Sequence, residues 1–190
     1  MVSTSTGRRL QDPKGGSFWF DAGAVCLDFA HTGGEGAYAK FESLHAPSDL
    51  EAWLAEPPLS AALTATAEDL TAAKALRQAI WVAAHAQADG FALPTNAVAT
   101  INAAAAEPPL IPQLGVGWAP PVRASQALST LARELIDLLS GPLADRFREC
   151  ASDNCPLVFV DSSRPGSRRW CAMERCGNRN KIRAHRARQA

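Results

Sequence analysis

The stretch CASDNCPLVFVDSSRPGSRRWCAMERCGNR, residues 150–179, contains four of the five cysteines of this 190-residue chain. Cys150 and Cys155 form one C-x4-C pair, and Cys171 and Cys176 form a second pair after a spacer of 15 residues. Two close pairs joined by a hairpin-length spacer suit four thiolates around a tetrahedral zinc ion. The spacing therefore predicts one structural zinc ion per chain.

Two disulfides or four unrelated thiols are the alternatives to a zinc site. A secreted disulfide protein begins with a charged segment and an apolar run, whereas this chain begins with the polar MVSTSTGRRLQDPKGG. The fifth cysteine, Cys26, lies far upstream and would stay unpaired, which favours a reducing compartment. We therefore expect a cytoplasmic protein. Because no apolar run reaches the length of a membrane span, we expect no membrane partner.

Charge is divided unevenly along the chain, although the formal net charge is zero. Residues 1–149 carry 10 Lys+Arg and 16 Asp+Glu, a net charge of −6. Residues 150–190 carry 9 and 3, a net charge of +6. A basic segment of this kind favours a polyanionic partner, and docking on the acidic body in cis is the alternative.

The rest of the chain is predicted to be mainly helical. Residues 1–16 lack periodicity and predict a flexible leader. Turn and capping signals place the other elements. They are a strand pair over 17–32, helices beginning near Ser48, Thr66, Pro94 and Leu128, and an irregular hairpin over 110–122.

These elements predict an α+β fold with a helical domain over residues 17–145 and a zinc module over residues 146–190. In the module, residues 157–160 and 169–170 are predicted to pair as a hairpin, and the fourth ligand is predicted at a helix start. This order of elements is that of a treble clef. The module has too little apolar content to fold without metal, whereas the helical domain is expected to fold by itself.

The cysteine module closely resembles the CGNR zinc finger, named for the tetrapeptide found here at residues 176–179. Both cysteine pairs match the family pattern. The other matching residues are Phe159, Asp161, Ser163, Arg164, Arg169, Trp170 and Lys181.

The upstream region resembles the ABATE domain of stress-induced transcription regulators. The resemblance rests on AVCLDFAHT, SDLEAWL and ALRQAI, and His31 stands where the family typically has Asn. It implies a DNA-binding regulator whose N-terminal domain senses a small-molecule effector or forms a homodimer.

Nucleic-acid contacts are predicted for the cations of the C-terminal segment. On a helix, Arg175, Arg179, Arg183 and Arg186 share one face, and a ridge of guanidinium groups can follow a phosphate backbone. The full predicted set is Arg164, Arg168, Arg169, Arg175, Arg179, Lys181, Arg183 and Arg186, with Arg188 near the end of the chain. A protein-interaction module without DNA binding and a merely structural finger are the alternatives.

A ligand pocket is a further hypothesis, and its candidate residues are Asp28, His31 and Arg77. A buried carboxylate needs a partner, and Arg77 is the candidate partner of Asp28. The pair is interpreted either as a structural ion pair or as the polar rim of a small-molecule pocket. An enzyme acting there is the weakest hypothesis, because four cysteines close the metal shell and no catalytic motif occurs. We predict that the protein is not an enzyme.

Overall fold

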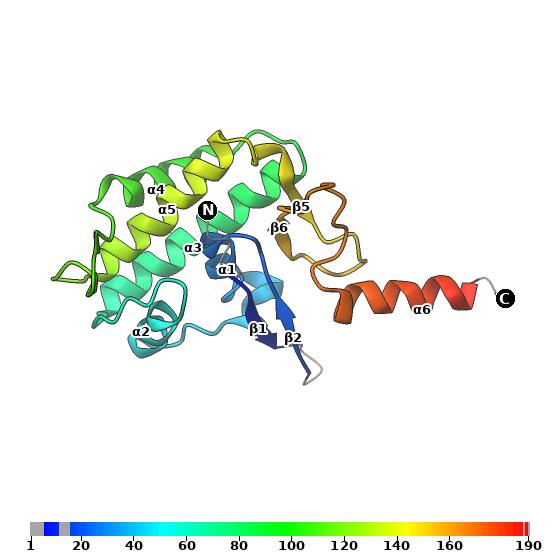
Figure 1. Ribbon diagram of the computed structural model, residues 1–190, viewed down its shortest axis with the longest axis horizontal. Coiled ribbons are helices and arrows are strands. Elements are labelled where there is room, and N and C mark those ends of the chain that lie inside the picture. The colour runs from blue at the N-terminus through cyan, green and yellow to red at the C-terminus, as the bar shows by residue number, and fades with distance from the viewer. Residues whose placement is uncertain (1–5, 12–15, 188, 190) are drawn as a thin grey trace.

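The computed structural model describes residues 6–11, 16–187 and 189. It confirms an α+β architecture, with mostly helical structure and pairs of short antiparallel strands (Figure 1). The α-helices are α1 (Val25–Ala30), α2 (Pro47–Ala55), α3 (Ala67–Ala88), α4 (Thr95–Ala106), α5 (Ala124–Ser140) and α6 (Asn178–Ala187). The strand pairs are β1 (Arg8–Gln11) with β2 (Ser17–Phe20), β3 (Pro112–Gln113) with β4 (Gly117–Trp118), and β5 (Phe147–Glu149) with β6 (Val158–Val160). No described helix combines the length and the apolar character that crossing a membrane requires.

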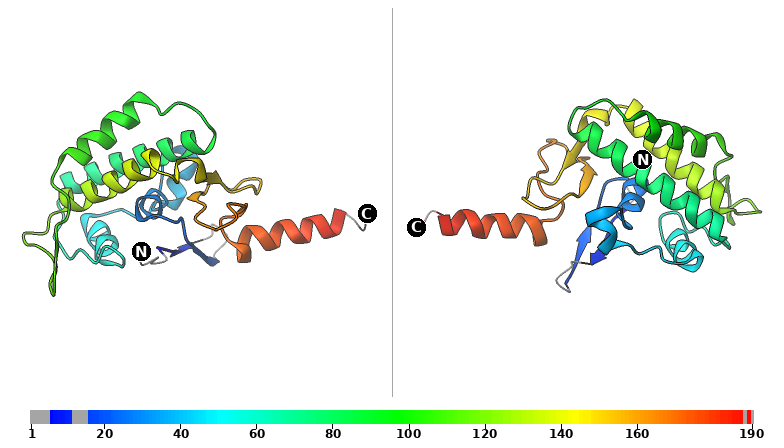
Figure 2. Two further views of the ribbon diagram at one scale, coloured as in Figure 1. Left: turned by 45° about the horizontal axis from the view of Figure 1, so that its top comes forward. Right: turned by 180° about the vertical axis from the view of Figure 1, so that it is seen from behind.

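Helix α3 is the element against which most of the helical body packs. It begins at the predicted capping box: the Asp69 N–H donates to Thr66 Oγ1 at 3.1 Å, and the Thr66 N–H donates to the Asp69 carboxylate at 2.9 Å. Small buried residues, such as Ala73 and Ala83, let neighbouring helices approach closely. Helices α1, α4 and α5 therefore pack directly along α3 (Figure 2).

The N-terminal region differs from the prediction in two places. Strand β1 pairs with β2, so the expected flexible leader is wrong for Arg8–Gln11; residues 1–5 and 12–15 lie outside the described part. The predicted second strand after the turn at 21–23 is helix α1 instead. All residues of α1 from Cys26 to Ala30 are buried, and a short, fully buried apolar run fits a strand and a helix equally well.

The cysteine module shares a continuous hydrophobic core with the helical body. Phe147, Phe159 and Val160 are at most 1% exposed and belong to the same buried cluster as the core side chains of α1, α3 and α5. The Val160 N–H also donates to the Ala22 carbonyl at 2.9 Å. Gly23, at φ +81°, lies so close to the Val160 carbonyl that a side chain would collide with it.

The hairpin of the module is formed by strands other than those predicted. Strand β6 pairs with β5, which precedes Cys150, and residues 169–170 form no strand. The Arg169 carbonyl instead accepts one hydrogen bond, from the Ala151 N–H at 2.9 Å. The first cysteine pair therefore lies in the loop between two paired strands. The treble-clef arrangement stays a prediction.

Candidate metal centre and basic helix

Four cysteine side chains converge between the β5–β6 loop and the helical turn Met173–Gly177. Cys150, Cys155, Cys171 and Cys176 are all buried, and their sulfur atoms lie within 4.8 Å of one another. The Sγ atoms of Cys155 and Cys171 are 3.7 Å apart. Zn–S bonds of about 2.3 Å place tetrahedral sulfurs about 3.8 Å apart, whereas a disulfide bond is only about 2.05 Å long. The cysteines are free thiols, and their arrangement fits one zinc ion.

Backbone and thiol hydrogen bonds favour the thiolate form of Cys150, whereas the hydrogen bonds that Cys155 and Cys171 donate to it raise the pKa of their own thiols. Hydrogen bonds from the Cys155 and Cys171 thiols, and from the Cys171 N–H at 3.3 Å, lower the pKa of Cys150. Cys26 lies elsewhere, in α1, where burial first and the nearby Glu134 second raise the pKa of its thiol well above the usual value. Cys26 is therefore an inert core thiol.

Two of the arginines predicted to contact nucleic acid instead face the metal ligands. The Arg175 Nη1 lies 3.4 Å from Cys155 Sγ and 4.0 Å from Cys176 Sγ. The Arg179 Nη2 lies 3.1 Å from Cys176 Sγ. Both guanidinium groups thus donate hydrogen bonds to sulfur, and the predicted cationic ridge is divided between the metal centre and the rest of α6.

The other predicted cations fall into three environments. Arg168 is structural: its Nη2 donates to the carbonyls of Asp21 at 2.8 Å and Cys171 at 2.6 Å. Arg183 pairs with Asp153 on the surface, and Arg169 stacks 5.0 Å from the Trp170 ring. The remaining three cations are exposed, and their side chains have no ion pair or hydrogen bond among the described residues. They are Arg164, Lys181 and Arg186. Arg188 lies outside the described residues.

Helix α6 extends away from the rest of the molecule towards the C-terminus (Figure 1). It contains Arg179, Lys181, Arg183 and Arg186 and no acidic residue. Its large apolar residue, Ile182, is itself exposed, so this part of the helix buries no apolar face. Beyond its first turns, α6 is therefore a solvent-exposed basic rod.

The predicted Asp28–Arg77 ion pair is wrong. Both nitrogens of the Arg77 fork donate to Glu42, from Nη1 to Oε1 at 2.6 Å and from Nη2 to Oε2 at 2.7 Å. Burial alone would raise the pKa of Glu42, but these hydrogen bonds and the Arg77 charge lower it to about 2. Arg77 is 3% exposed, so the pair anchors the segment before α2 to α3 as a buried structural contact.

Asp28 and His31 lie on and at the end of α1, facing different neighbours. Oδ1 of Asp28 accepts a hydrogen bond from the Ala22 N–H at 3.2 Å, while Oδ2 is buried without a partner among the described residues. Burial raises the pKa of Asp28 to about 7. Desolvation lowers the pKa of His31 to about 4, and its Nε2–H donates to the Val158 carbonyl of the cysteine module at 2.8 Å.

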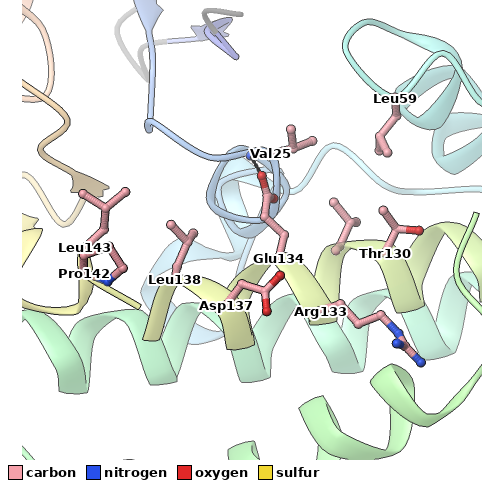
Figure 3. Close-up of a pocket in the computed structure, with 10 residues that line it drawn as sticks. Val25, Leu59, Thr130, Arg133, Glu134, Asp137, Leu138, Pro142 and Leu143 are labelled. Atoms are coloured by element: carbon pink, nitrogen blue, oxygen red, sulfur yellow. Dashed lines mark hydrogen bonds between the residues drawn. The ribbon is translucent and has the colours of Figure 1, made fainter. Parts of the chain in front are cut away.

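A cavity of about 500 Å³ lies between α1 and α5, away from the predicted pocket (Figure 3). Most of its lining is apolar, with Glu134 and Asp137 as the acidic members and Arg133 as the basic one, whose guanidinium donates to Ser129 Oγ at 3.2 Å and to the Glu107 carbonyl at 3.3 Å. The Glu134 carboxylate is already used, because it accepts hydrogen bonds from the Val25 N–H at 3.3 Å and the Cys26 N–H at 2.6 Å. The lining residues are Val25, Leu59, Thr130, Leu131, Arg133, Glu134, Asp137, Leu138, Pro142 and Leu143.

A helical body joined to a four-cysteine metal module with a basic terminal helix defines a zinc-finger protein. The family model of ABATE, described as "putative stress-induced transcription regulator", matches residues 23–142, and the chain belongs to this family. The CGNR zinc finger model matches residues 146–189. Neither description names an enzyme activity. The search of curated proteins gave no match.

Three supporting residues were missed by the sequence analysis. Ser152 is 4% exposed and holds Arg179, with 3.3 Å between Ser152 Oγ and Arg179 Nη2. Asn180 Nδ2 donates to Ser152 Oγ at 2.9 Å, and the Phe18 ring lies 4.5 Å from the Arg175 guanidinium. For Ser152, its position between the ligands Cys150 and Cys155 was a sequence signal of a role at the metal centre. For Phe18 the sequence contains no such signal, because it contacts the module from a position distant in sequence.

Proposed function

We propose that the protein is a cytoplasmic transcription regulator that binds DNA through α6, with zinc holding the base of that helix. The observation that carries the proposal is the projecting helix with four cations and no acid. Cationic helices can enter the major groove, while lysine and arginine side chains neutralise the flanking phosphates. Family membership supports the regulatory role.

The available contact residues are the cations that the metal centre does not use. Lys181 and Arg186 lie on the exposed length of α6, and Arg183 can exchange its surface pair with Asp153 for a phosphate. Arg164 and Arg169 add exposed cations on the loop between the cysteine pairs. Because the net negative charge of the body repels DNA, α6 and this loop set the orientation of the complex.

Replacing Lys181 and Arg186 together by alanine is expected to weaken binding to duplex DNA. Each neutralised phosphate releases about 0.9 counterion, so the slope of log K against log salt should flatten by about one unit for each phosphate that the variant no longer neutralises. Fluorescence anisotropy of the zinc-loaded full chain at several salt concentrations measures this slope. Arg123→Ala, which removes an exposed cation at the start of α5, is the matched control and should leave it unchanged.

A chain that binds no duplex DNA at low salt, while retaining zinc and helicity, would contradict the proposal. The protein-interaction alternative would then be favoured by two apolar side chains beside the metal centre and on α6. Met173 is 64% exposed and Ile182 is 54% exposed.

We further propose that the helical body senses an effector in the cavity between α1 and α5. Its volume of about 500 Å³ suits a small molecule. The Asp137 carboxylate has no ion pair or hydrogen bond among the described residues, so the lining favours an apolar ligand carrying a positive charge. Pro142 and Leu143 contribute to the wall just before the metal module, which gives an occupant direct contact with the connection to the finger.

A small aromatic amine is expected to stabilise the protein more than an acid of similar size. We would compare thermal unfolding midpoints with 2-phenylethylamine and with phenylacetate at equal concentrations. Asp137→Asn should abolish the preference for the amine, and Leu138→Trp should abolish stabilisation by filling the cavity. Equal effects of the two probes, or a response that survives Leu138→Trp, would contradict a cation-selective cavity. Dimerisation, the other role expected of the body, is tested separately by the sedimentation mass of the full chain.

A further inference from the structure

The zinc centre implied by the four cysteines is strongly anionic. Four thiolates outweigh one divalent cation, so the complex carries two units of negative charge in a largely buried position. Buried charge is costly unless it is paired and hydrogen-bonded. The two guanidinium groups described above lie where this charge is concentrated.

We propose that Arg175 and Arg179 are positioning residues of the metal centre, which neutralise the zinc thiolates and slow the loss of the ion. Arg175 reaches one sulfur of each cysteine pair, and Arg179 reaches a sulfur of the second pair. Arg175 donates to Cys155 at 3.4 Å, and Arg179 donates to Cys176 at 3.1 Å. The Cys171 N–H, which donates to Cys150 Sγ at 3.3 Å, supplies a further hydrogen bond to the sulfurs. Charge-assisted hydrogen bonds to thiolate reduce its electron density and thereby its reactivity towards competing metals and electrophiles.

Both arginines are held in place by other side chains. The Arg175 guanidinium stacks on the Phe18 ring of β2 at 4.5 Å, so the N-terminal hairpin contributes to the metal centre. Arg179 is held by Ser152 Oγ, which also accepts a hydrogen bond from Asn180 Nδ2 at 2.9 Å. The Asn180 amide in turn donates to the Cys176 carbonyl at 2.8 Å. Arg179 is exposed like the other cations of α6, so it is this support and the contact with sulfur that distinguish the two arginines from them.

The proposal separates two roles within one basic segment. The cations near the base of α6 serve the metal, and those further along it remain free for a polyanion. Loss of Arg179 should therefore first affect metal retention. Loss of Lys181 should leave metal retention unchanged, because its side chain has no contact with sulfur among the described residues.

The test compares zinc release from the full-length, zinc-loaded protein and its glutamine variants. Arg179→Gln and Arg175→Gln are each expected to lose zinc at least about 10-fold faster to the coloured chelator 4-(2-pyridylazo)resorcinol, as outer-shell changes at metal sites typically do. Arg186→Gln and Lys181→Gln each remove one positive charge from α6 without removing a hydrogen bond to sulfur or a contact with the ligand loop. These control variants should release zinc at the wild-type rate.

Cobalt substitution gives a readout that depends on the sulfur atoms themselves. In the Co²⁺ protein, the sulfur-to-metal charge-transfer band of Arg179→Gln should shift to lower energy, because the sulfur lone pairs lose a stabilising hydrogen bond. Arg179→Lys, which keeps the charge and a single donor, should recover part of the shift and part of the retention. Unchanged release and an unchanged band in folded glutamine variants would overturn the proposal. Equal acceleration in Arg186→Gln and Lys181→Gln would also overturn it, since net charge alone would then explain the effect.

Discussion

Alanine at Cys155 or Cys176 is expected to abolish zinc retention and to lower the free energy of unfolding of the whole chain by more than about 4 kcal/mol. The sequence alone predicted that residues 150–190 would unfold and that the helical body would stay folded. The structure changes this expectation, because Phe147, Phe159 and Val160 complete the core that α1 and α3 begin. Losing the module would expose that apolar surface of the body to water.

Calorimetry and segment-resolved hydrogen exchange would measure this effect. A single cooperative transition at a lower temperature is expected, with protection decreasing together in α3, α5 and the metal module. Cys26→Ala is the matched control, because it removes a buried sulfur outside the cluster and should leave zinc bound. Loss of protection confined to the module, with α3 and α5 unaffected, would show that the body folds independently.

Asp28→Asn is expected to change the pH dependence of stability. Folding raises the pKa of Asp28 from 3.8 to about 7. The protonated carboxyl therefore contributes stability that is fully present below about pH 4 and is lost as the pH rises through 7. At about 1.4 kcal/mol per pKa unit, the loss approaches about 4 kcal/mol as an upper bound. The Asn variant cannot ionise, so its stability at pH 7.5 should exceed that of the wild-type chain by a large part of this amount.

Titration of His31 changes the free energy of unfolding in the opposite direction over part of the same pH range. Its pKa falls from 6.5 to about 4 on folding, so the neutral ring contributes stability that grows as the pH rises from about 4 to 6.5. The contributions of Asp28 and His31 to stability nearly cancel between about pH 4 and 6.5. The stability of the wild-type chain should therefore be nearly constant there and should fall towards pH 7. In His31→Asn, stability should fall as the pH rises, because only the contribution of Asp28 remains. In Asp28→Asn, stability should increase as the pH rises, because only the contribution of His31 remains. Urea unfolding from pH 4 to 8 measures both, and parallel curves for all three proteins would refute this account.

Patterns that are local in sequence were predicted well. The two cysteine pairs located the metal centre, because the ligand spacing itself encodes a tetrahedron. Thr66 and Asp69 located the start of α3, because a capping box is complete within four residues. The apolar face of α5 and the hairpin around Trp118 followed from periodicity and turn residues for the same reason.

Features that depend on distant partners were not predictable. The partner of Arg77 is Glu42, 35 residues away, and nothing in the local pattern prefers it over Asp28. The short run that became α1 lacks periodicity because all its sides are buried. Helical spacing predicted a shared face for four arginines, but spacing does not show whether a helix face meets solvent or sulfur. The cavity between α1 and α5 arises from tertiary packing alone.

The contact between the N-terminal hairpin and the turn that carries Cys176 constrains how the protein can be made. The Trp19 N–H donates to the Glu174 carboxylate at 2.6 Å, and Phe18 packs on Arg175. These partners are about 155 residues apart, so the second of each pair is synthesised long after the first. Until residues 174 and 175 have been synthesised, the hairpin of β1 and β2 lacks the surface it packs against. Its apolar side chains stay exposed to water during that time. Zinc capture and closure of the core must both follow the synthesis of Cys171 and Cys176, so the metal supply at that stage decides how much protein reaches the folded state.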